Sequence, residues 1–428
     1  MAAQLSIVQL LRVVAQHRCY ADSLSFSHRV TRNPRVFILA MRQLFVSLVI
    51  SAGMLAPAQA QELTFTLVEQ FVIGDDEEAS AEYLLSFPKM VRTDSKGNIY
   101  VQDRRRMDIR VFDATGQYVT TIGKRGEGPG EMRDIIGMHV DDQDRLIVAD
   151  RISARFTIFT EMGNGIETIS FADERTISPH PILSLEGAYV LRYVRLIDDP
   201  EEDLPHINDD YTLHLHDSKL NRIESFARLD ELFDLNRPFL KADSDSPDAL
   251  IMATNGIDTI ILAPEIYSGY VYRYTRSNGS WDMEKLKGSP APRRAYIPFS
   301  ERDLEANRDL LASSIATSDR TGVYRAKVLN WSVGIAILST SEFVNFTKQT
   351  PLRGRGELGN KAELFDQDGS LQGYGPLQFD SPELSSNGNV MDSISILWTD
   401  GNDRVYLRRR NEQGYYVLSV AELVIRPR

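Results

Sequence analysis

Short apolar runs separated by turns follow one another between residues 90 and 123. The runs cover residues 90–91, 99–101, 109–112 and 118–120, and within residues 109–112 apolar and polar side chains alternate. Alternation with a period of two predicts β-strands, and the Gly- and Asn-containing turns between the runs favour tight antiparallel connections. A single sheet of four short strands cannot bury both its faces, so this pattern predicts that further sheets pack against it.

The four-strand unit is repeated along the chain. Residues 141–150 repeat residues 94–103 without a gap, and Phe159 repeats Phe112. Repeats of four strands at a spacing of about 40–50 residues are typical of β-propellers, in which neighbouring sheets, called blades, stack around an axis. The repetition therefore predicts an all-β chain built from four-stranded antiparallel blades.

Later copies of the unit are weaker but keep the same order. They comprise residues 189–191 and 211–215 for a third blade, 257–262 and 270–274 for a fourth, 365–369 for a fifth and 400–407 for a sixth. Six blades fit this spacing best, and seven remain open because the fifth blade is poorly bounded. The predicted fold is a six-bladed β-propeller over residues 61–428.

The two ends of the predicted propeller are expected to pair with each other. Residues 62–68 alternate as a strand before the first full blade, and residues 416–420 and 423–425 supply the last strands. A closed ring of repeats needs a latch, and pairing the first strand with the last blade provides one. Truncation of either end is then expected to open the ring.

One segment departs from the strand pattern. Residues 300–303 resemble a capped helix start, and Leu304, Leu311 and Ile315 then recur at helical spacing. These features predict one short helix over residues 301–316, inserted between blades four and five. The helix is expected either to cover one face of the ring or to pack against the outer edge of a blade.

The first 60 residues have a different character. Residues 41–60 combine a basic start, an apolar run at 44–55 and a small-residue end at 58–60, as in a secretory signal peptide. We expect cleavage after Ala60 and export to the periplasm or the medium. The apolar run is shorter than the roughly 20 residues that span a membrane, so no integral span is expected. Residues 1–40 are interpreted either as a targeting extension or as an over-extended start, with Met41 the true first residue.

Charge and cysteine content exclude some partners and bonds. The formal net charge of −12 argues against a general phosphate-binding surface, so nucleic acid is not an expected partner. The only cysteine, Cys19, precedes the expected cleavage site. The mature chain is therefore compatible with an oxidising compartment but is not stabilised by disulfides.

These residues resemble the NHL-repeat class of six-bladed propellers, in the form found in exported bacterial proteins. Residues 97–103 look like the second strand of that class, and residues 123–132 look like its Gly-rich link between blades. Arg155 stands where the repeat has an arginine before its third strand, whereas Asp108 occupies that place in the first blade. The resemblance implies a fold and a habit of binding on one face, but no reaction.

Basic residues gather in one kind of loop. Because strands in a blade alternate in direction, the loop between strands two and three shares a face with the link to the next blade. This rule predicts a basic arc on one face, formed by Arg104, Arg105, Arg106, Lys124, Arg125, Arg151, Arg353, Arg355, Arg408, Arg409 and Arg410. The corresponding loop of the third blade is instead acidic, at residues 198–203 and 209–210.

Two interpretations of the basic arc stay open. The arc binds an anionic ligand such as an acidic glycan, a peptide or a lipid headgroup, or it is balanced by the acidic insertion and by solvent. Gly126, Gly128 and Gly130 superficially resemble a phosphate-binding loop, but no helix pattern follows Glu131, so a link between blades is the better interpretation.

Metal and cofactor sites are not expected. The histidines after residue 60 are His139, His180, His206, His214 and His216. His214 and His216 share one face of a strand and could both contact a metal, but outer-strand histidines are more often surface residues. His139 lies on a first strand and could point into the central channel. We predict no metal and no cofactor.

The predicted function is that of an exported, monomeric, non-catalytic binding or scaffolding module that uses one loop face for an anionic ligand or a partner protein. The alternative is a channel-site hydrolase or lyase, similar to lactonase-like or lyase-like propellers. An enzyme needs several polar first-strand residues that converge on the axis. The candidate first strands at 90–91, 137–140 and 182–183 are mostly apolar, which favours binding.

Overall fold

The computed structural model describes residues 60–75, 80–171, 176–177, 182–197, 206–207, 210–244, 246, 249–289, 294–312, 314–319, 322–350 and 359–428. The described residues belong to one compact unit, residues 59–428. The predicted signal peptide and the segment before it lie outside the described residues. Within the described ranges, every helix is too short or too polar to cross a membrane.

The first two sheets contain the strands that the sequence predicts. The first comprises β2 (Pro88–Thr93), β3 (Ile99–Asp103), β4 (Ile109–Phe112) and β5 (Tyr118–Ile122), and the second comprises β8 (Ile135–Val140), β9 (Leu146–Asp150), β10 (Arg155–Thr160) and β11 (Gly165–Ser170). All neighbours are antiparallel. The link between the sheets carries β6 (Lys124–Arg125) and β7 (Glu131–Met132), and the 3₁₀ turn Glu161–Gly163 precedes β11.

The next two sheets repeat this arrangement. They comprise β13 (Ile182–Leu185), β14 (Ala188–Arg192), β17 (Tyr211–Asp217) and β18 (Arg222–Arg228), then β19 (Leu250–Thr254), β20 (Thr259–Pro264), β21 (Tyr270–Ser277) and β22 (Ser280–Lys287). Short strands β12 (Thr176–Ile177), β15 (Val194–Ile197) and β16 (His206–Ile207) form a separate three-stranded sheet. The strands predicted for the third and fourth blades are therefore present.

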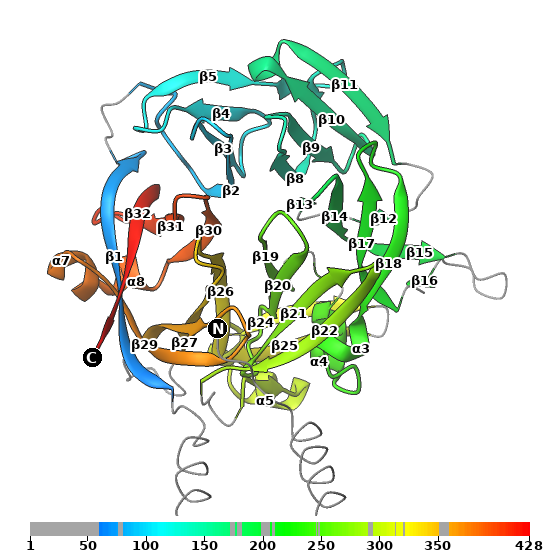
Figure 1. Cartoon of the computed structure of the whole chain (residues 1–428). Coiled ribbons are helices and arrows are strands. Elements are labelled where there is room, and N and C mark those ends of the chain that lie inside the picture. The colour runs from blue at the N-terminus through cyan, green and yellow to red at the C-terminus, as the bar shows by residue number, and fades with distance from the viewer. Residues whose placement is uncertain are drawn as a thin grey trace, which may run out of the picture. The chain divides into compact units, whose positions relative to one another are not determined.

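The last sheet has eight strands and contains the predicted latch. Its order is β26 (Asn330–Ile337), β27 (Phe343–Gln349), β28 (Gly359–Phe365), β29 (Leu371–Phe379), β1 (Gln61–Ile73), β32 (Tyr416–Pro427), β31 (Arg404–Arg410) and β30 (Ser395–Thr399). β1 pairs antiparallel with β32, as the sequence predicts, and the two lie side by side in Figure 1. β1 also pairs in parallel with β29, which the sequence did not indicate.

Within the unit formed by residues 59–428, the sheets are arranged around a common centre (Figure 1). Their innermost strands contact one another in the cyclic order β2, β8, β13, β19, β26, β30 and back to β2. Buried side chains fill the space between neighbouring sheets, as where Tyr100 and Val111 pack with Met138 and Val148. This face-to-face packing buries the surface that a single sheet leaves exposed.

Recurring aspartates fix the turns between strands. Asp94, Asp141 and Asp400 each accept hydrogen bonds from the backbone N–H groups two and four residues further on. The residue three positions after each aspartate has a positive φ, and Gly97 takes that position in the first sheet. Asp side chains stabilise such turns locally, which explains why the Asp-rich repeat is legible in the sequence.

The predicted helix at residues 301–316 is wrong in extent. α5 (Glu301–Ala306) ends early, α6 (Asp309–Ala312) follows, and Ile315 begins β24 (Ile315–Asp319). The capping start is confirmed, since the N–H of Asp303 donates to Oγ of Ser300. The helix stops because none of its residues is buried, whereas β24 pairs with β25 (Gly322–Val328) in a sheet completed by β23 (Tyr296–Phe299).

The prediction of one inserted helix is also wrong in number for the described part of the chain. Further short helices are α3 (Leu229–Leu232), α4 (Pro238–Ser244), α7 (Pro382–Ser386) and α8 (Gly388–Met391). Each is at most seven residues long. Such short pieces carry too few periodic apolar positions to be distinguished from loops in the sequence.

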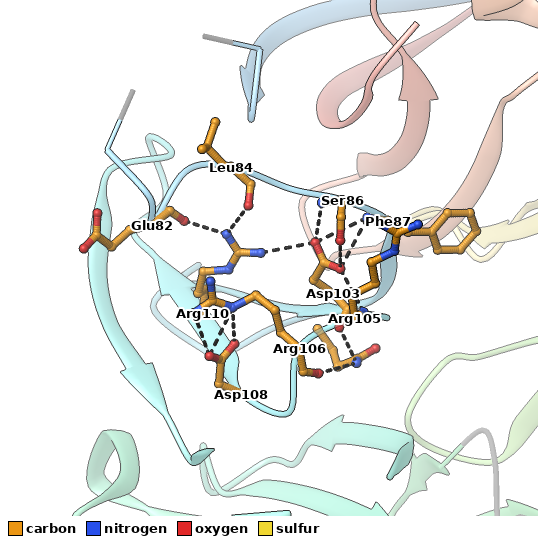
Figure 2. Close-up of polar contacts among 10 residues, drawn as sticks. Glu82, Leu84, Ser86, Phe87, Asp103, Arg105, Arg106, Asp108 and Arg110 are labelled. Carbon is orange, nitrogen blue, oxygen red and sulfur yellow. Dashed lines mark hydrogen bonds and ion pairs between the residues drawn. The ribbon is translucent and has the colours of Figure 1, made fainter. Parts of the chain in front are cut away.

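The arginine that braces the link between sheets is present, but in the first sheet it stands at a different position from the repeat pattern. Arg155 donates to the carbonyls of Gly128 and Glu131, at 2.9 and 2.8 Å. In the first sheet Arg110 donates to the carbonyls of Glu82 and Leu84 instead, at 2.8 and 2.7 Å (Figure 2). Arg110 therefore takes over the bracing role that Asp108 cannot perform.

Candidate functional site

The predicted basic residues of the first sheet lie in the loop between β3 and β4. Arg104, Arg105 and Arg106 follow β3 and are exposed. The N–H of Arg104 donates to the carbonyl of Phe87, which precedes β2, so this loop and the link meet on one face. Arg106 pairs with Asp108 at 2.7 Å (Figure 2).

The basic residues near the second sheet are largely neutralised by local partners. Lys124 pairs with Glu131 at 3.1 Å, and Arg151 pairs with Asp134 at 2.6 Å. Arg125 is exposed in β6. Exposed pairs of this kind contribute little energy, but they reduce the positive potential that a ligand would experience.

Arg408, Arg409 and Arg410 lie within β31 and not in a loop, which corrects their predicted placement. Successive side chains of a strand point to opposite faces of the sheet, so the side chain of Arg409 lies on the face opposite to those of Arg408 and Arg410. Arg409 is 3% exposed and forms an ion pair with Glu69 of β1. Arg410 lies 4.8 Å from the ring centre of Tyr416. The sequence pattern failed here because three consecutive arginines resemble a loop, whereas their burial depends on strands far away in the chain.

Arg353 and Arg355 lie outside the described residues, as do residues 198–205 and 208–209 of the acidic insertion. Asp210, at its end, pairs with Arg228 at 3.6 Å.

Arg104 and Arg408 meet at one aromatic ring. The guanidinium carbon of Arg408 lies 3.9 Å from the ring centre of Phe87, and that of Arg104 lies 5.8 Å from it. Arg408 also donates to the carbonyl of Pro88 and to Oγ of Ser395, at 3.1 and 2.9 Å. Cation–π contact and two hydrogen bonds hold the Arg408 head group in place.

A cavity of about 350 Å³ between the innermost strands, called here the inner cavity, is lined by Phe87, Arg104, Ser395 and Arg408. Its walls come from four of those strands: β2, β19, β26 and β30. Charged residues of the lining are Lys89, Arg92, Arg104, Arg408 and Glu265. Four cations against one carboxylate make the inner cavity a region of positive potential.

A second cavity of about 530 Å³, called here the outer cavity, adjoins the inner one. Both are lined by Phe87, Trp331, Val333, Ser395 and Arg408. The outer cavity adds Lys327, Lys348, Asp392 and Tyr416. Burial lowers the pKa of Lys348, whose ammonium donates to the backbone carbonyl of Asp392.

Most of this site was not predicted from the sequence. Of the nine predicted basic residues that the structure describes, Arg104 lines the inner cavity, Arg408 lines both cavities, and the other seven line neither. Arg92 and Trp331 also line the inner cavity but are not among the predicted site residues. Arg92 directly follows the predicted first strand at residues 90–91 and lies within β2, and its charge was the signal that could have located it.

A larger cavity of about 990 Å³ lies beside α3, α4 and β21. Its charged lining mixes both signs, and Arg237 is already paired with Asp234 at 2.8 Å. Lys285 lies 4.3 Å from the ring centre of Tyr270. This cavity therefore lacks the excess of positive charge that the inner cavity has.

The histidines of β17 serve the core. His214 and His216 are 0% and 4% exposed, so their predicted surface position is wrong. His214 hydrogen-bonds Oγ of Ser225 and the carbonyl of Tyr193, while His216 contacts the carbonyl of Leu220 and the Tyr193 hydroxyl. β18 covers this strand, which explains the burial. Among the described residues no three His, Cys, Asp or Glu side chains are grouped for a metal.

The Gly-rich link does not offer its amides to a phosphate. The N–H of Gly128 donates to Oε2 of Glu131 at 2.9 Å. A Cβ added at Gly126 would lie 2.0 Å from the same carboxylate oxygen. The chain thus fills this loop with its own anion, in agreement with its interpretation as a link.

Comparisons with known proteins identify the fold. Residues 78–178 match a family described as "6-bladed beta-propeller" (DUF5128). A member of the DUF4221 family from Bacteroides vulgatus has a similar structure, with 12% identity and a TM-score of 0.51 over 86% of this chain and 100% of that chain. No curated protein sequence matches the chain.

Two further structures are less similar. An 11%-identical gluconolactonase from Xanthomonas campestris aligns over 86% of this chain and 99% of its own, with a TM-score of 0.41. A 12%-identical protein from Bacteroides fragilis aligns over 86% and 95%, with a TM-score of 0.49. The described part of the chain is a β-propeller.

Proposed function

We propose that this chain is an exported six-bladed β-propeller that binds an anionic ligand at the mouth of its central channel, without catalysing a reaction. Export rests on the signal-peptide pattern of residues 41–60. The NHL-like repeat pattern of residues 94–103 and 141–150 supports a propeller of that class.

The blade count rests on the cyclic contacts of the innermost strands. β2, β8, β13, β19, β26 and β30 each begin a four-stranded antiparallel set. The eight-stranded sheet counts as two blades because its halves meet at the parallel pair β1 and β29, whereas the strands within each half are antiparallel. Under this count β1 is the outer strand of the sixth blade.

One observation carries the binding function: Arg104 and Arg408 flank Phe87 in a cavity where cations outnumber carboxylates. An acidic protein that concentrates cations in one concave region favours an anionic partner there through complementary potential. The aromatic side chains of Phe87, Trp331 and Tyr416 add aromatic surface to the cavity lining beside these charges. Together they suit an acidic glycan better than a compact inorganic anion.

The test measures binding of polygalacturonate, an acidic glycan, at low and high salt. We expect affinity to fall with salt and to drop several-fold in Arg104→Ser and in Arg408→Gln. Arg125→Ser is the matched control, because Arg125 is exposed and lines neither cavity. Binding that is insensitive to salt and to both cavity substitutions, or that is lost equally in the control, overturns the proposal.

A further inference from the structure

Arg92 is an uncommon feature of the inner cavity because it is a buried cation. It lies in β2 and is 6% exposed. Its Nη1 donates to the carbonyl of Val91 at 2.7 Å, and its guanidinium carbon lies 4.5 Å from the ring centre of Trp398. Its Nε has no hydrogen-bond partner among the described residues.

No carboxylate among the described residues balances the buried charge of Arg92. Arg92 forms no ion pair with a carboxylate in the described part of the chain, and burial alone lowers its pKa to about 10. The buried Arg110 and Arg409 differ, since they pair with Asp103 and Glu69. Burying an unpaired charge is costly, and a guanidinium keeps its proton at neutral pH.

The adjacent strand adds no second charge. His139 of β8 is 3% exposed, and burial together with the charge of Arg92 lowers its pKa to about 3. The imidazole is therefore neutral at physiological pH. Its Nε2 contacts Oγ of Ser184, while its Nδ1 is buried without a hydrogen-bond partner among the described residues. Arg92 thus supplies the positive charge at this depth.

We propose that Arg92 binds a carboxylate of the ligand, and that this carboxylate belongs to a uronic acid that enters between Arg104 and Arg408. The inference rests on the proposed function, because it assumes that the ligand enters by the channel mouth. It adds the chemical class of the group that is bound and the residue that anchors it.

The geometry favours a carboxylate over phosphate or sulfate. A planar guanidinium matches the two oxygens of a carboxylate, and one of its N–H groups is already taken by Val91. A dianion costs more to remove from water, and one buried cation offsets less of that cost. The indole of Trp331, which lines both cavities, offers a face on which a sugar ring can stack.

The experiment is calorimetric titration of the purified protein with sodium glucuronate, with glucose and sodium sulfate at matched ionic strength as comparison probes. We expect glucuronate to bind more tightly than either. Arg92→Met, which keeps a long apolar side chain against Trp398, is expected to weaken glucuronate binding about tenfold or more. Arg125→Ser is expected to leave it unchanged.

Melting of the ligand-free variant distinguishes binding from a structural role. If Arg92 is a ligand anchor, Arg92→Met removes an uncompensated buried charge and melts at the same or a higher temperature than the wild type. A lower melting temperature with unchanged glucuronate affinity shows that Arg92 only braces Val91 and Trp398, and overturns the inference. Tighter binding of sulfate, or Arg92-dependent binding of an N-acetylated dipeptide but not of glucuronate, overturns the sugar assignment.

The inference and the proposed function fail separately. Loss of glucuronate binding in Arg92→Met, with polygalacturonate binding unaffected by Arg104→Ser and Arg408→Gln, supports Arg92 as the carboxylate anchor. The same result rejects ligand binding beside Arg104 and Arg408 at the channel mouth. Unchanged glucuronate binding in Arg92→Met, with polygalacturonate binding weakened by Arg104→Ser and Arg408→Gln, rejects only the role of Arg92 as anchor.

Discussion

Arg409 of β31 and Glu69 of β1 form a bidentate ion pair across 340 positions of sequence, with Nε–Oε2 and Nη2–Oε1 distances of 2.9 and 3.0 Å. The Ser419 hydroxyl donates to the same carboxylate. The pair therefore fastens the N-terminal strand to β31 and β32, the strands that precede the C-terminus. It reinforces the backbone pairing of β1 with β32 at the point where the ring closes.

Removal of one partner of this pair should destabilise the propeller. Because Arg409 is 3% exposed, Arg409→Met leaves Glu69 without its counter-charge, and we expect a loss of about 3 kcal/mol in the free energy of unfolding. Urea unfolding followed by circular dichroism measures it. The double variant Arg409→Met with Glu69→Leu should recover much of the loss. Arg428→Ala, which breaks the exposed pair with Glu62, is the control and should change little.

The parallel contact between β1 and β29 depends on small residues. A Cβ at Gly375 would lie 1.6 Å from the backbone oxygen of Leu63, closer than any real contact. We expect Gly375→Ala to separate β1 from β29 and to cost more than about 2 kcal/mol in stability. Gly401→Ala is the control, since a Cβ there meets nothing within 4 Å. Equal melting temperatures for the two variants would contradict this account.

Asp243 should make the protein less stable as pH rises from about 4 to about 7. Its carboxyl is 6% exposed, and burial raises its pKa from 3.8 to about 7, an effect partly opposed by Arg192. Between these values the unfolded chain ionises while the folded chain stays protonated, so the equilibrium shifts toward unfolding. Because a tenfold change in proton affinity corresponds to about 1.4 kcal/mol, the difference between the folded and unfolded pKa values limits this loss of stability to about 4 kcal/mol.

Asp243→Asn is expected to remove this contribution. Its stability relative to the wild type should increase as pH rises from about 4 to about 7 and then level off. Chemical unfolding at a series of pH values provides the measurement. If the difference in unfolding free energy between the wild type and the variant does not change with pH, Asp243 is ionised in the folded protein.

His139 should make the protein less stable as pH falls, which is the opposite of the effect of Asp243. Its pKa is lowered from 6.5 to about 3, so the unfolded chain takes up a proton as pH falls below about 6.5 while the folded chain does not. This histidine therefore contributes stability above pH 6.5 that is lost progressively toward pH 3. His139→Gln, which keeps a polar partner for Ser184, is expected to unfold less readily in acid relative to its own stability at neutral pH. The same unfolding series tests it, and an unchanged acid slope argues against a neutral buried imidazole.

The repeat could be predicted because its signals are local. Period-two patterning defines β3 and β4, and the Asp94 and Asp141 turns hold their hydrogen bonds within four residues, so the sequence alone locates them. The prediction of a helix at 301–316 was wrong because it also used a local signal, the helical spacing of Leu304 and Ile315. In the structure the residues of α5 have no buried surface to pack against, so the helix ends early.

The amino-acid sequence by itself determined the four-strand unit and its repetition, because turn chemistry and side-chain alternation act over a few residues. The pairing of the first strand with the last ones followed from the repetition, since a closed ring of repeats needs a latch. Only the tertiary structure decided which charges remain available. Ring closure brings Arg408 onto Phe87, buries Arg409 against Glu69 and encloses Arg92 without a carboxylate. Their partners lie hundreds of residues away, or in Arg92's case are missing from the described chain. A side chain's burial depends on those distant neighbours, which no local pattern records.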